Sequence, residues 1–145
     1  MDPREFQVLA SELVIKDRAS DIRTAISRAY YAVFNVGVEI LTELGFKVSE
    51  GPSGHGDVRN RLSNSGDTET AKVGSQLNNL HTRRLHADYR LSRKDVESQK
   101  TAEALVQLAD KMIKSLDECR SAPKRHQIIK AIQEWETKTQ RPYTS

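Results

Sequence analysis

The sequence predicts an all-α fold, namely an antiparallel four- to five-helix bundle with an additional C-terminal helix. Apolar residues recur every three or four positions along most of the 145 residues, which is the spacing of one helical face. Only 7 Gly and 4 Pro interrupt this spacing. No stretch alternates convincingly as a strand does, and no internal repeat is present.

The composition favours a cytoplasmic protein with no membrane association. The chain is 37% hydrophobic and 30% charged, a balance typical of folded rather than disordered proteins. No run approaches the roughly 18 apolar residues of a membrane span, and the N-terminus lacks a secretory signal. The single cysteine, Cys119, excludes an intrachain disulfide and a cysteine-only zinc site. The net charge of +3 permits nucleic-acid binding without demanding it.

Capping residues predict where the first two helices begin. We expect the first over residues 3–16, with Asp2 as its N-cap. We expect the second and longest over residues 20–44, with Ser20 or Asp21 as its N-cap.

A glycine-bearing loop follows. Gly45 is a natural end for the second helix, and four of the seven glycines lie between Gly45 and Gly56. The loop lacks the Gly-Lys-Ser/Thr ending of a phosphate-binding loop, so we interpret it as a connection between helices. A short third helix is expected over residues 57–62, where Arg59 and Arg61 make it basic.

The fourth helix is expected over residues 68–91. Arg84 falls where its apolar stripe predicts another apolar residue. Because an unpaired buried charge is costly, Arg84 must be paired or must line a cleft. His81, Arg84 and Asp88 share one face of this helix and form a polar patch.

Two further helices complete the chain. The fifth, capped by Ser92, has a long apolar stripe typical of a buried core helix, and Pro123 opens the sixth. We therefore expect a helical bundle over residues 1–120, a C-terminal helix over 121–138 packed on the same domain, and a flexible tail over 139–145.

The longest helix carries a polar seam beside its apolar face. Arg28 and Asn35 lie seven positions apart, so they return to nearly the same face at a separation of about 10 Å. Tyr31 and Glu39 fall on the same stripe.

Residues 27–34 closely resemble the second-helix signature of the HEPN superfamily, S-R-A-Y-Y-A-x-F-H, and Asn35 stands where the family has His. Residues 84–89 match the family's later signature, R-x-x-A-D-Y, and His55 is well placed for a family His after the glycine-bearing loop. The matched segments, with the closing helix, span about residues 20–116.

This resemblance implies an antiparallel helical bundle that pairs as a homodimer. In active relatives the helix-two Arg and His of both subunits meet in a cleft and cleave RNA without metal. The resemblance also implies a prokaryotic defence or toxin–antitoxin setting, with a nucleotidyltransferase-type partner protein. No metal-ligand spacing of histidines appears, and we expect no metal and no cofactor.

The motif positions assign the candidate site. Arg28 keeps the phosphate-binding role, whereas the amide of Asn35 neither gains nor loses a proton near neutral pH. We therefore expect RNA or nucleotide binding with weak or absent nuclease activity. The candidate catalytic positions are Arg28 and Asn35. The candidate nucleic-acid or ligand-binding positions are Arg28, Tyr31, His81, Arg84 and Asp88.

Two other interpretations stay open, so whether the chain is an enzyme is undecided. It is an active metal-independent RNA endonuclease if His81 replaces the missing imidazole. It is a non-catalytic structural or interaction module if Arg28 pairs with Asp88, or if Arg84 and Asp88 only tie helices together. The tyrosines of both motifs are expected mainly to pack: Tyr30, Tyr31 and Tyr89.

Overall fold

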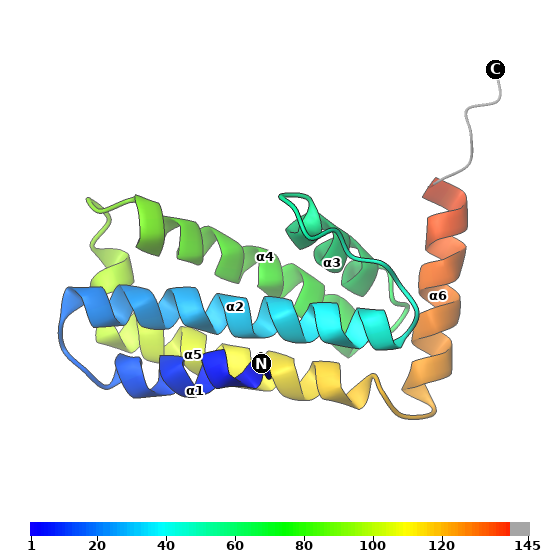
Figure 1. The fold of residues 1–145 in the computed structure, drawn as a ribbon, viewed down its shortest axis with the longest axis horizontal. Helices are drawn as coiled ribbons and strands as arrows, with labels where there is room; N and C mark the ends of the chain where they lie inside the picture. Colours follow the sequence, from blue (N-terminus) through cyan, green and yellow to red (C-terminus); the bar gives the residue numbers. More distant parts are fainter. Residues whose placement is uncertain (140–145) are drawn as a thin grey trace, which may run out of the picture.

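The computed structural model describes residues 1–139, which form an all-α bundle (Figure 1). Four helices run along the long axis, α3 lies beside α4, and α6 stands across one end of the bundle. The elements are α1 (Arg4–Val14), α2 (Ala19–Glu43), α3 (Gly54–Ser63), α4 (Thr68–Tyr89), the short 3₁₀ helix η1 (Asp95–Glu97), α5 (Gln99–Glu118) and α6 (Lys124–Thr139). The predicted fold class is confirmed.

The core is organised around α2, which packs against α1, α4 and α5. Each fully buried aliphatic side chain of this core contributes about 1.5–3 kcal/mol relative to an exposed one. Cys119 belongs to the same core, because it is 1% exposed and its Sγ lies 3.4 Å from Oγ1 of Thr70. Burial raises the pKa of this thiol. The fully buried residues of α2 include Ile22, Ile26, Val33, Ile40 and Leu41.

The two ends of α2 test the capping predictions. Gly45 has φ of 97°, a conformation that favours glycine, and the Phe46 amide donates to the Leu41 carbonyl at 2.9 Å. The predicted end is therefore confirmed. The helix starts one residue earlier than predicted, at Ala19. The predicted N-cap, Ser20 or Asp21, is wrong by two or three residues, because Arg18 is the N-cap and its side chain pairs with Asp21 at 2.8 Å.

The predicted start of the fifth helix is also wrong. The helix begins at Gln99, and Ser98, not Ser92, is its N-cap and accepts from the Thr101 amide at 3.3 Å. Residues 90–97 instead wrap around the guanidinium of Arg23, which donates to five backbone carbonyls and pairs with Glu97 at 2.6 Å. Those carbonyls belong to His86, Ala87, Arg90, Leu91 and Arg93.

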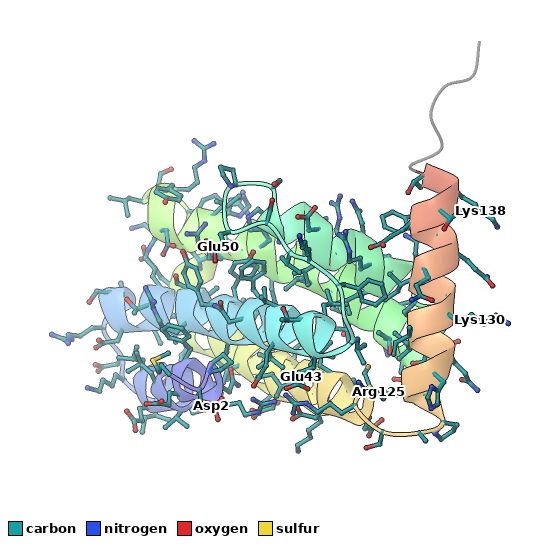
Figure 2. The ribbon with its side chains drawn as sticks, turned by 45° about the vertical axis from the view of Figure 1, so that its right-hand side comes forward. Asp2, Glu43, Glu50, Arg125, Lys130 and Lys138 are labelled. Carbon is teal, nitrogen blue, oxygen red and sulfur yellow. The ribbon has the colours of Figure 1, made fainter. Side chains whose placement is uncertain are left out.

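The sixth helix covers the end of the bundle opposite η1 (Figure 1). Ile128 and Ile132 of α6 are buried, and Arg61 of α3 pairs with Glu136 at 2.9 Å. The side chains of Lys130 and Lys138 point away from the bundle (Figure 2). The tail expected over residues 139–145 lies, after its first residue, outside the described residues.

Within residues 1–139, no helix combines the length and the apolar character that crossing a membrane requires.

Candidate functional site

One face of α2 stays open along the bundle. This open face consists of Thr24, Arg28, Tyr31, Asn35 and Val38, which are exposed or half-buried, whereas most of the remaining circumference is buried. Its members follow one another at three- and four-residue spacing, which keeps them on one side of the helix. The predicted polar seam therefore exists.

Arg28 lies beside two aromatic rings, those of Phe6 and Tyr31, whose centres are 6.2 Å apart and which therefore also contact one another. Its guanidinium carbon is 5.5 Å from the ring centre of Phe6 on α1 and 5.0 Å from that of Tyr31 on α2. Among residues 1–139 it makes no hydrogen bond and no ion pair. The alternative in which Arg28 pairs with Asp88 is wrong, because the Asp88 carboxylate is held by other groups.

Those groups are Arg84 and Ser27. The Nε of Arg84 lies 3.0 Å from Oδ2 of Asp88, and Oγ of Ser27 donates to the same oxygen at 3.1 Å. A second nitrogen of Arg84, Nη2, donates to the hydroxyl of Tyr31. Arg84 is therefore paired, as its position in an apolar stripe required, and it joins α4 to α2 through Tyr31.

Rings and guanidinium groups alternate across three helices. The Arg84 guanidinium carbon lies 5.0 Å from the ring centre of Tyr31 and 5.7 Å from that of Tyr89. We call the series Phe6, Arg28, Tyr31, Arg84 and Tyr89 the arginine–aromatic ladder. Each step is a cation–π contact, which contributes about 0.5–1 kcal/mol at an exposed site. The ladder places two cations beside stacking surfaces on the open face.

Asn35 occupies the motif position of the missing His. Its Nδ2 donates to the backbone carbonyl of Tyr31 at 2.8 Å, within the same helix. Together with Phe6, Val38 and Glu39 it lines an open hollow of about 320 Å³ between α1 and α2. The side chain therefore lies at an open hollow, where its chemistry is limited to hydrogen bonding.

A second group of residues, the histidine cluster, joins α2, α3 and α4. It consists of Tyr30, His55 and His81. The imidazole rings of His55 and His81 stack with centres 3.9 Å apart, and Nδ1 of His55 shares a hydrogen bond of 2.8 Å with Tyr30 Oη. The ring of His81 also lies 5.2 Å from that of Tyr30. His55, placed by the family resemblance, thus has a partner that sequence alone did not identify.

The histidine cluster is held in its neutral state. Burial, and then the neighbouring His81, lower the pKa of His55 to about 4. Burial and the nearby Arg84 lower the pKa of His81 as well. Burial raises the pKa of Tyr30 to about 12. At neutral pH both imidazoles are therefore uncharged. His81 and Arg28 have different neighbours, because His81 packs against Tyr30 and His55, whereas Arg28 packs against Phe6 and Tyr31.

Sequence reasoning missed three residues. The spacing of apolar residues predicted Phe6 as an ordinary core residue, yet it is half-buried and its ring contacts the guanidinium of Arg28. Tyr89 was expected to pack, which is wrong, because it is 67% exposed. The burial of Arg23 could have been predicted from the sequence, because Arg23 lies three residues before Ile26 and seven before Tyr30, on the apolar stripe of α2.

Within the described part of the chain, no three His, Cys, Asp or Glu side chains gather closely enough to hold a metal ion. Comparisons with protein-family models, with curated proteins and with solved structures each return no match for this chain.

Proposed function

We propose that this chain is a HEPN-like protein that binds RNA or a nucleotide through the open face of α2, in a cleft shared with a second copy, and that it cleaves RNA weakly or not at all. The observation that carries the proposal is Arg28, a half-buried guanidinium that contacts two aromatic rings and has no carboxylate partner in residues 1–139. The family resemblance adds the homodimer, a defence or toxin–antitoxin setting and a nucleotidyltransferase-type partner.

The state of Arg28 favours an anionic ligand. Contact with the two rings uses none of the guanidinium N–H groups of Arg28, and the edge that carries these groups matches two phosphate oxygens at once. A cation that is half-buried without a counter-charge has lost part of its hydration, so pairing with a phosphate recovers favourable energy. Arg84 is less available, because Asp88 and Tyr31 already occupy part of its edge.

Binding is tested with a 5′-labelled single-stranded RNA by fluorescence anisotropy at several salt concentrations. We expect affinity to fall as salt rises, and Arg28→Ala to weaken binding and to reduce the slope of log K against log salt by about 0.7 per lost phosphate contact. Lys130→Ala is the matched control, since it removes one positive charge from α6, where the side chain points away from the bundle (Figure 2).

A second candidate function is that of an interaction module. The observation that favours it is the Arg84–Asp88 pair, which with Ser27 and Tyr31 ties α4 to α2 and uses groups assigned to ligand binding. Absence of RNA and nucleotide binding in the parent chain, combined with a lower melting temperature for Arg84→Ala, supports this function over the first.

A further inference from the structure

The arginine–aromatic ladder ends in solvent, at Tyr89. This residue is the last of α4, and its side chain is 67% exposed. One part of its ring meets the guanidinium of Arg84, 5.7 Å away, and the rest is uncovered within the described structure. By contrast Tyr30, on α2, is only 4% exposed. The ladder therefore presents an aromatic surface that the bundle itself does not use.

Two guanidinium groups are close to Tyr89 in space or in sequence. Arg84 lies on one side of the ring and is paired with Asp88, whereas the next residue, Arg90, is exposed and has no carboxylate partner among residues 1–139, so Arg90 is the cation left free for a phosphate. An aromatic ring beside guanidinium groups offers a nucleic acid both of the contacts that it needs, namely a stacking surface for a base and a cation for the adjoining phosphate.

We infer that Tyr89 stacks on an unpaired nucleobase of the RNA whose backbone Arg28 holds, an inference that rests on the proposed function. Inside a double helix both faces of each base are covered by neighbouring bases, so, apart from the terminal pairs, only unpaired bases offer a face to an exposed ring. The ring of Tyr31 contacts both Arg28 and Arg84, and Arg84 contacts Tyr89, so a series of direct contacts joins the proposed phosphate contact to the proposed stacking surface. The site therefore selects single-stranded over duplex RNA.

The test measures binding of one labelled RNA of mixed sequence, alone and annealed to its complement. Tyr89→Ala is expected to weaken binding of the single strand about 5- to 150-fold, which is the effect of losing one base–aromatic stack. Tyr89→Phe keeps the ring and is expected to keep the affinity. Leu91→Ala is the matched control, because Leu91 is 72% exposed and directly follows Arg90 in the sequence but contributes no ring. Because Tyr89→Ala removes the ring contact with Arg84 but no buried side chain, it is expected to lower the melting temperature by only a few degrees, whereas Tyr89→Phe is expected to melt at the parent temperature.

The salt dependence separates this inference from the proposed function. Tyr89→Ala removes no charge, so the slope of log K against log salt is expected to match the parent, whereas Arg28→Ala lowers the slope. If Arg28→Ala weakens binding and Tyr89→Ala behaves like Leu91→Ala, the stacking role is wrong and the proposed function stands. Equal affinity for single-stranded and duplex RNA also overturns the stacking role. A parent chain that binds no RNA at any salt concentration overturns both.

Discussion

At the scale of single residues, Arg23 has the most demanding position in the bundle. Its side chain is 9% exposed, and its N–H groups donate to carbonyls at the end of α4, namely that of Ala87 and that of His86, which also accepts from the Arg90 amide. The positive charge also complements the negative end of the helix dipole. The side-chain hydrogen bond from Arg23 lowers the pKa of Glu97. One residue of α2 thus fixes the path of the chain from α4 to α5.

Arg23→Ala is expected to lower the free energy of unfolding by about 3–5 kcal/mol, because it leaves buried carbonyls and a carboxylate without their cation. Urea denaturation followed by circular dichroism measures the change. Arg93→Ala is the control, since its backbone carbonyl remains for Arg23 while its half-exposed side chain pairs only with Asp95. Equal shifts in the two variants would contradict the role assigned to Arg23.

The second residue whose chemical type matters at this scale is Asn35, because an amide cannot transfer protons near neutral pH. Asn35→His places an imidazole at the open hollow, where it can transfer protons near neutral pH. We expect cleavage of single-stranded RNA in the presence of a chelator to rise by about 10²-fold or more, within the usual contribution of acid–base catalysis. Gel analysis of the products measures it, and adding Arg28→Ala to the same chain is expected to abolish the gain. Rapid cleavage by the parent chain would show that Asn35 does not limit the reaction.

At the scale of elements, the histidine cluster joins three helices through neutral rings. His55 at the start of α3 stacks on His81 of α4 and shares a hydrogen bond with Tyr30 of α2. The facing charges, Arg59 and Arg84, are both positive and act against protonation. The packing of α3 on the bundle therefore depends on uncharged imidazoles.

Stability is expected to fall as pH drops from about 6.5 towards 4. The pKa of His55 is lowered from 6.5 to about 4 in the folded state, so the unfolded chain binds more protons in this window. The stabilisation is complete above 6.5 and is lost as pH approaches 4. Urea midpoints at half-unit pH steps measure it, and His55→Gln combined with His81→Gln is expected to flatten the dependence. An equally steep dependence in the double variant would contradict this assignment.

Element boundaries were predictable where a local rule decided them. Gly45 ended α2 as expected, because only glycine adopts its positive φ without strain. Ser92 failed as the cap of α5, because a tertiary contact from Arg23, 69 positions earlier in the sequence, holds the intervening segment in another conformation. Propensity describes a segment by itself and carries no information about such a partner.

At the scale of the whole molecule, the spacing of the apolar residues was enough to predict the helical bundle. The candidate site could be predicted from the sequence only in part. The open face of α2 was visible as a polar seam, and Arg84 was visible as a charge in an apolar stripe. The pairing of Arg84 with Asp88 and the stacking of Arg28 on Phe6 depend on how three helices pack, which no single helix pattern encodes.

The proposed homodimer is a prediction at this scale. We expect light scattering after size exclusion to give twice the mass of one chain. Val38→Glu is expected to give the mass of a single chain, because it places a charge on the open face, where the two copies are proposed to meet. Ile15→Glu is the control, since Ile15 is 74% exposed at the end of α1. Single-chain mass in the parent at all concentrations would contradict the dimer.

The burial of Cys119 has a practical consequence. The chain has 1 cysteine, and its thiol is enclosed and kept protonated, so maleimide reagents reach it poorly. A cysteine introduced by Lys138→Cys would then be the preferred labelling position. It lies on α6, at the opposite end of the bundle from the C-terminal end of α4 (Figure 1), so a dye or a surface tether there leaves the proposed stacking surface at Tyr89 unobstructed.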